Sequence, residues 1–200
     1  MTLQRMAVSA GLAVGLATAG WGIAATAGTT VASGSTGAAT AGLTANRTAQ
    51  PVSSQDRMFM DEASQINLAE ISLGSYMVAH GTTTTAKDLG GTYVRDHAAA
   101  QGRLRVLALR LHLTLPANPG KQLESVAAQV KAQKGLSMDV AFAKASVSGH
   151  EKAIAIFRKE ESAGSNPAVK AYAANYLPML QAHLRLAKRA ESAMRATPTG

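Results

Sequence analysis

Four residues that can bind a metal ion stand in the middle of otherwise apolar helical stripes. They are Glu70, His97, His150 and His183. Apolar side chains lie three or four residues to either side of each one, so each is expected on the inward face of its helix. A carboxylate or an imidazole in an apolar core is costly unless it is paired or ligated. Four of them on separate helices therefore predict a single polar cluster inside a four-helix bundle.

Two interpretations of this cluster are open from the sequence. Three imidazoles and one carboxylate are a ligand set for one transition-metal ion, with zinc, iron, manganese or copper as the candidates. Alternatively, the cluster is a hydrogen-bonded core network in which Glu70 pairs with His97. In that network Tyr76, Tyr93 or Tyr176 would satisfy the other imidazoles.

Asp96 comes directly before His97 and points about 100° away from it around the helix. It is expected to pair with Arg95, Arg103 or another helix, or else to orient one of the imidazoles from the flank of the bundle. His80 and His112 fall at predicted helix ends and are not counted as ligands.

Other chemistries find no support in the sequence. The chain has 0 Cys, which excludes thiol nucleophiles, disulfides and metal–thiolate sites. No strand–turn–helix nucleophile elbow, no glycine-rich phosphate loop and no catalytic carboxylate pair is recognisable. No catalytic residue is predicted, and a binding protein is favoured over an enzyme.

The apolar periodicity predicts an all-α fold with four long helices, at about residues 55–79, 86–113, 138–161 and 167–190. A short extra helix is expected in the connection between the second and third helices, ending at Gly135. The expected caps of the long helices are Ser53 or Ser54, Thr85 with Asp88, Ser137, and Asn166 followed by Pro167. Pro178 lies inside the fourth helix and should kink it.

The first part of the chain has the pattern of an export signal. A positive charge at Arg5 precedes a mostly small and apolar run, and Ala25-Thr26-Ala27 fits a cleavage site. The domain prediction is a signal peptide over 1–27, a flexible linker over 28–52, the bundle over 53–193 and a disordered tail over 194–200. We therefore expect export to an extracytoplasmic location, with a retained membrane tether as the alternative.

The net charge of +8 comes from basic residues scattered along the predicted helices. One interpretation is that these charges only keep the surface solvated. The more specific interpretation is that they attract envelope polyanions or anionic lipid surfaces. No nucleic-acid motif accompanies the charge, so no nucleic-acid partner is expected. The oligomeric state is left open.

Several residues and short motifs of the chain resemble those of one bacterial family. They are Asp56 to Phe59, Glu70, Asp96-His97, Leu115-Pro116, Asp139, His150 with Phe157, Pro167, and Leu177-Pro178 through His183. Together they resemble the domain of unknown function 4142, whose members carry the label "predicted outer membrane protein". The resemblance spans about residues 53–190 and implies a ferritin-like bundle exported to the envelope, with no established activity.

One departure from ferritin-like di-iron proteins bears on mechanism. Those proteins use Glu-x-x-His on two helices, whereas Val94 and Leu180 stand three residues before His97 and His183. A dinuclear ferroxidase centre is therefore not expected. The leading hypothesis is one core metal ion that serves metal buffering or oxidative-stress protection. The alternative is a non-catalytic envelope scaffold or adaptor with a structural His/Glu network and a basic surface.

Overall fold

The computed structural model describes residues 51–196, and that part of the chain is helical apart from its connections. It contains α1 (Ser54–His80), α2 (Thr84–Arg110), α3 (Lys121–Lys131), α4 (Gly135–Ala163) and α5 (Pro167–Arg195). No strand occurs among these described residues, so the predicted all-α class is confirmed. The predicted signal peptide, nearly all of the linker and the last four residues of the tail lie outside them.

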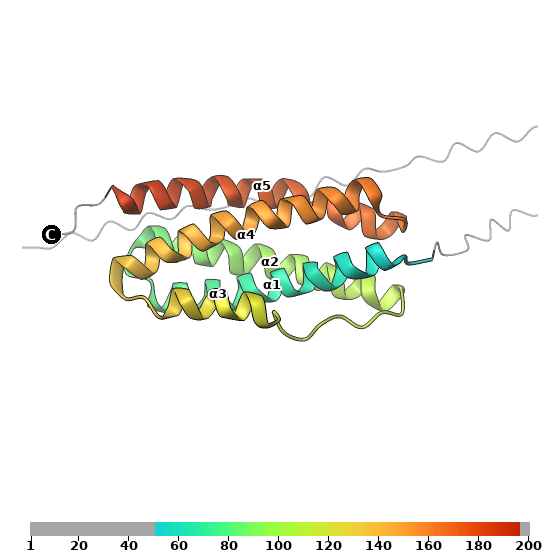
Figure 1. The fold of residues 1–200 in the computed structure, drawn as a ribbon, viewed down its shortest axis with the longest axis horizontal. Helices are drawn as coiled ribbons and strands as arrows, with labels where there is room; N and C mark the ends of the chain where they lie inside the picture. The colour runs from blue at the N-terminus through green and yellow to red at the C-terminus, as the bar shows by residue number, and fades with distance from the viewer. Residues whose placement is uncertain (1–50, 197–200) are drawn as a thin grey trace, which may run out of the picture. The chain divides into compact units, whose positions relative to one another are not determined.

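The four long helices form a ferritin-like bundle of two helical hairpins. Figure 1 shows α1 beside α2 and α4 beside α5, with α3 in the connection between the hairpins. Helix α1 also contacts α4, and α2 contacts α5, whereas the diagonal pairs touch little. Helix α3 packs on α1 and α4, as expected for a short helix in a long crossover. Within residues 51–196, no helix is both long and apolar enough to cross a membrane.

The predicted caps of the first and last helices are present. Ser53 Oγ accepts a hydrogen bond from Asp56 N at 3.1 Å, and the Asp56 carboxylate accepts from Ser53 N at 2.7 Å. This reciprocal pair is a capping box. Asn166 Oδ1 accepts from Ala168 N, and Pro167 takes the first position of α5.

Other helix ends differ from the predictions. Helix α2 is capped by Thr83, whose Oγ1 accepts from Ala86 N, and not by Thr85. It ends at Arg110, because His112 adopts a left-handed φ of 54° that a helix cannot continue through. Helix α4 begins at Gly135, before the predicted cap. Helix α5 continues past residue 193, since Met194 is buried in the core.

Two buried aspartates join each hairpin to the start of a helix in the other. Asp56 on α1 accepts from the backbone N–H groups of residues 165 and 166, where α5 begins. Asp139 on α4 accepts from those of residues 82 and 83, where α2 begins. These partners show that Asp139 stabilises the start of α2, because a carboxylate satisfies the unpaired N–H groups there.

Apolar side chains form two core clusters along the bundle. One gathers around Phe59, Phe157 and Tyr172, and the other around Tyr93 and Phe142. Edge-to-face ring contacts hold both clusters, such as Phe59 with Phe157 at a centroid distance of 4.9 Å. The buried polar residues at mid-bundle lie between them.

Two glycines allow α1 and α2 to approach closely. A Cβ on Gly90 would lie 2.7 Å from Gly74 O, which is a backbone atom that cannot rotate away. We expect Gly90→Ala to lower the free energy of unfolding by about 1–3 kcal/mol, through overpacking. Gly102→Ala is the matched control, because nothing lies within 4 Å of that position, and a gain of up to about 1 kcal/mol is expected there. Equal urea midpoints for the two variants would contradict the close approach.

Glu160, near the end of α4, is buried against Gln55 and Asp56 at the start of α1. Gln55 Nε2 donates to its Oε2 at 3.1 Å, and its carboxyl also hydrogen-bonds to Asp56. Burial and the bond to Asp56 raise the pKa of Glu160 to about 7, against the opposing effects of Gln55 and Lys170. Burial also disfavours the charge of Asp56, but hydrogen bonds from Ser53 and Asn166 hold its pKa at about 2. Below about pH 7, Glu160 is therefore protonated and donates a hydrogen bond to the ionised Asp56.

This carboxyl pair predicts a pH dependence of stability. The folded pKa of Glu160, about 7, lies above its ordinary value of 4.5, so the folded chain holds this proton more tightly. The contribution is complete below pH 4.5 and is lost as the pH rises through 7. Glu160→Gln should remove this loss, which is measured as urea midpoints of the variant and the parent at several pH values. A difference between the two proteins that stays unchanged over this pH range would contradict the prediction.

Candidate functional site

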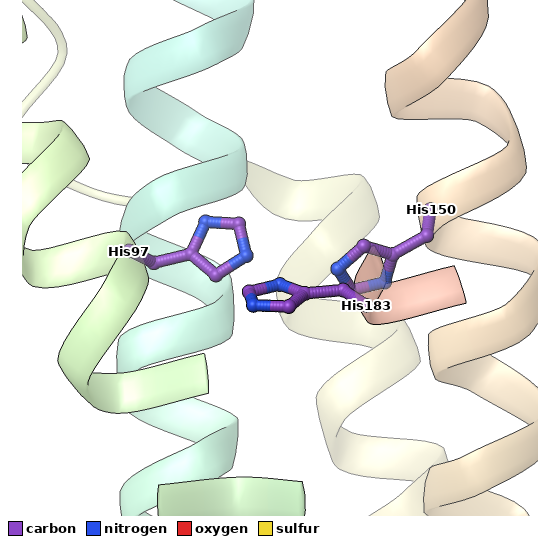
Figure 2. Close-up of side chains that lie close together, drawn as sticks. All are labelled: His97, His150 and His183. Atoms are coloured by element: carbon purple, nitrogen blue, oxygen red, sulfur yellow. The ribbon is translucent and has the colours of Figure 1, made fainter. Parts of the chain in front are cut away.

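Three histidines meet at the middle of the bundle. His97 on α2, His150 on α4 and His183 on α5 point toward one another (Figure 2). One ring nitrogen of each lies within 4.8 Å of the others, and the ring centroids are 5.3–5.8 Å apart. The side chains are 0–2% exposed. The structure therefore brings together three of the four predicted ligands.

The helices position these rings through buried residues one turn away. His97 lies between Tyr93 and Ala100, and all three are buried. His150 lies between Ser146 and Ala153 in the same manner. Because residues three and four apart share a helix face, these buried neighbours place both rings on the inward face of the bundle.

On two of the rings, one nitrogen bonds to a group that can only accept. His183 Nε2 lies 3.0 Å from Asp96 Oδ2, and His150 Nδ1 lies 2.9 Å from the Ser146 carbonyl oxygen. Partial burial opposes ionisation of Asp96, but hydrogen bonds from Arg95 and His183 lower its pKa, so it is a carboxylate. These nitrogens must carry the hydrogen, which leaves a lone pair on the other nitrogen of each ring. The third ring, His97, bonds through Nδ1 to Asn67 Oδ1 at 2.9 Å.

The remaining nitrogen of each ring is buried and has no hydrogen-bond partner among the described residues. These atoms are His97 Nε2, His150 Nε2 and His183 Nδ1. Burial lowers the pKa of His97 well below 6.5, and the nearby His150 and His183 add to this effect. Burial also lowers the pKa of His183, in part against the hydrogen bond to Asp96. His97 and His183 are therefore held as neutral imidazoles, and a bound cation would satisfy all three unpartnered nitrogens of the cluster.

Tyr93 covers one side of the cluster. Its ring centroid lies 4.9 Å from that of His150 and 4.8 Å from that of His183, and the side chain is fully buried. Its hydroxyl donates to the His183 carbonyl at 3.5 Å. Burial raises the pKa of Tyr93, so it remains a neutral wall. Tyr176, another predicted supporting tyrosine, instead stacks on Tyr172 at 4.7 Å, and no contact with the histidines is seen in residues 51–196.

Asp96 has both of the roles that the sequence left open. It accepts from His183, as described above, and forms an ion pair with Arg95 at 2.9 Å. It therefore orients one imidazole from the flank while being held by a surface arginine. Carboxylates that accept from the outer N–H of a histidine are a common support for metal ligands.

Glu70, the predicted fourth ligand, is not placed with the three histidines. Its Oε1 lies 3.8 Å from His150 Nδ1, which is the nitrogen already bonded to the Ser146 carbonyl. The side chain remains 14% exposed, and burial raises its pKa, although the nearby His150 opposes this. Asn67, one turn earlier on α1, takes the inward position instead. Glu70 is therefore a neighbouring acid on the outer side of His150.

The polar residues that support His97 are not marked by the apolar pattern of the sequence. Asn67 Nδ2 donates to Gln101 Oε1 at 3.1 Å, and Gln101 Nε2 donates to Ser64 Oγ at 2.9 Å. All three are buried. Large apolar residues define the predicted stripe of α1, whereas Asn67 shares its buried face with the small residues Ala63 and Ser64.

The comparisons with known proteins place the chain in a family. The model of a domain of unknown function, DUF4142, matches residues 41–190, which include all three histidines and most of the bundle. The chain belongs to this family. The resemblance read from the sequence is thereby confirmed, and this DUF4142 bundle has a fold that occurs in another family.

A solved structure shares the fold of this DUF4142 chain. The crystal structure of a DUF305 fragment from Deinococcus radiodurans matches it with a TM-score of 0.64 at 14% sequence identity. The match covers 72% of this chain and 99% of the fragment. At this identity the likeness establishes a common helical bundle only. No curated protein sequence matches the chain.

Proposed function

We propose that this DUF4142 protein binds one transition-metal ion in the core of its bundle, through His97, His150 and His183. The observation that carries the proposal is the set of three buried ring nitrogens without a partner in one cluster. A hydrogen-bond network, the alternative interpretation, would leave few such groups, because buried polar atoms are nearly always paired. Metal binding accounts for all three at once.

The donor set indicates the class of metal. Neutral imidazoles suit zinc, copper, iron and nickel, whereas manganese, magnesium and calcium prefer carboxylate and carbonyl oxygens. Since Glu70 lies outside the cluster, manganese becomes a weaker candidate than the sequence suggested. Metal–nitrogen bonds of about 2.0–2.1 Å bring ligand nitrogens to within roughly 3.5 Å of one another. The rings must therefore close in slightly from their present spacing of up to 4.8 Å.

The proposed role is metal buffering or oxidative-stress protection at an extracytoplasmic location. Export rests on the N-terminal sequence pattern alone. The single cluster of three histidines supports a mononuclear site, and the apolar residues Val94 and Leu180 give no bridging carboxylates for a second ion. The basic surface would hold the protein near anionic envelope components.

The proposal is tested with the metal-free full-length chain. Calorimetric titration with zinc and with copper should give one ion per chain and an affinity of about micromolar or tighter. The melting temperature should rise with added metal and fall again with a chelator, because a ligand of the folded state stabilises it by mass action. Binding weaker than about millimolar for every metal, with no shift in melting, would exclude the proposed function.

A further inference from the structure

His97 differs from the other two histidines in the kind of group that holds it. A carboxylate and a carbonyl, which only accept, hold His183 and His150. His97 instead meets the amide of Asn67, whose two ends are an acceptor and a donor. If the amide were reversed, its NH₂ group would face Nδ1 and take up that lone pair, and the hydrogen would move to Nε2, inside the cluster. The orientation of Asn67 therefore decides whether His97 can ligate.

We propose that a directional hydrogen-bond relay, anchored on two backbone carbonyls, fixes Asn67 and thereby the Nδ1–H tautomer of His97. Its first branch runs through Tyr172. The Tyr172 hydroxyl donates its only hydrogen to the Ala100 carbonyl, at 3.3 Å. A carbonyl cannot donate in return, so the hydroxyl oxygen is left as an acceptor for Asn67 Nδ2, also at 3.3 Å.

The second branch runs through Gln101 and Ser64. The Ser64 hydroxyl donates to the Pro116 carbonyl at 3.3 Å, in the connection between α2 and α3. Its oxygen then accepts from Gln101 Nε2 at 2.9 Å, which turns Gln101 Oε1 toward Asn67 Nδ2 at 3.1 Å. Both hydrogens of the Asn67 amide are thus required on the side away from His97.

Both branches require the same orientation of the Asn67 amide. They lie inside the core, where an unsatisfied amide is costly. Ser64, Asn67, Gln101 and Tyr172 are 0–5% exposed. Reversing Asn67 would set its oxygen against Gln101 Oε1 and against a hydroxyl whose hydrogen is already used. Asn67 is therefore a positioning residue that acts through His97. The relay matters for function only if the proposed metal site is correct, but the tautomer is a property of the metal-free protein.

The test is NMR of metal-free full-length protein labelled with ¹⁵N in the histidine rings, at a pH where His97 is neutral. The parent should show His97 with hydrogen on Nδ1. Tyr172→Phe and Ser64→Ala each break one branch and keep the shape of the core, and the double variant breaks both. In the double variant, the ratio of the Nδ1–H to the Nε2–H form should fall at least about fivefold, the factor for loss of one neutral hydrogen bond.

Three further variants separate the relay from a general loss of structure. Tyr176→Phe also removes a tyrosine hydroxyl next to Tyr172, but outside the relay, and should leave the tautomer unchanged. Asn67→Asp keeps an oxygen toward His97 and should retain Nδ1–H, whereas Asn67→Leu should lose it. An Nε2–H form in the parent, or an unchanged ratio in the single and double variants, overturns the relay. Metal titration of the parent is scored separately, so a failed metal site and a failed relay are distinguishable.

Discussion

Replacing His150 with alanine is expected to lower the affinity for zinc or copper by more than about 100-fold. Removal of a group that only supports a ligand costs about 10–100-fold, and a missing ligand costs more. The His150 ring also packs against the rings of Tyr93 and His183, so removing it leaves a gap in the centre of the cluster. Calorimetry of the metal-free variant measures the change.

His112→Ala is the matched control for this prediction. His112 is exposed and lies beyond the end of α2, away from the cluster, so its removal should leave metal affinity unchanged. Because His150→Ala also removes a buried ring, circular dichroism must show an intact bundle before titration. Equal affinities for the His150 and His112 variants would remove His150 from the site.

Asp56→Ala should cause the largest loss of stability of any single change considered in this protein. The Asp56 carboxylate accepts from Ser53 N and Oγ at 2.7 Å and from the backbone N–H groups of residues 165 and 166. Hydrogen bonds to a charged group contribute more than neutral ones, and their loss leaves buried donors unpaired. We expect a loss of about 3–5 kcal/mol in the free energy of unfolding, measured by urea unfolding.

Asp61→Ala on the same helix provides the comparison. Asp61 forms a partly exposed ion pair with Arg57 at 3.1 Å, one turn apart. Such pairs contribute at most about 1 kcal/mol. If Asp56→Ala were no more harmful than Asp61→Ala, the proposed joining of the two hairpins by Asp56 would be wrong.

The helices and the three inward histidines could be predicted because both follow from the spacing of apolar residues. His97, His150 and His183 each lie within a stripe of buried neighbours, and the period alone fixes their direction. Glu70 has equally apolar neighbours but lies near the edge of the buried face of α1. The choice between Glu70 and Asn67 depends on how α1 is rotated in the bundle, which local sequence does not determine.

Contacts between distant segments could not be predicted from periodicity. Asp139 reaches the start of α2, and Asp56 the start of α5, because the two hairpins are arranged alike. A short motif shared by α1 and α4 reflects this similar arrangement of the two hairpins. Asp56-Arg57-Met58-Phe59 and Asp139-Val140-Ala141-Phe142 share the spacing Asp-x-x-Phe at equivalent helices. Asn67 and His150 each follow their aspartate by 11 residues, so comparing the hairpins would have marked Asn67 as inward-facing.

The most direct test of the central claim is a crystal structure of the zinc-loaded protein with anomalous diffraction measured at the zinc edge. If the three histidines bind the ion, one strong peak should lie at mid-bundle, at about 2.0–2.1 Å from His97 Nε2, His150 Nε2 and His183 Nδ1. Those nitrogens would then have moved closer together than in the present structure. A peak bound only at surface residues such as Glu151 or His80, with the three ring nitrogens still unpartnered, would contradict it.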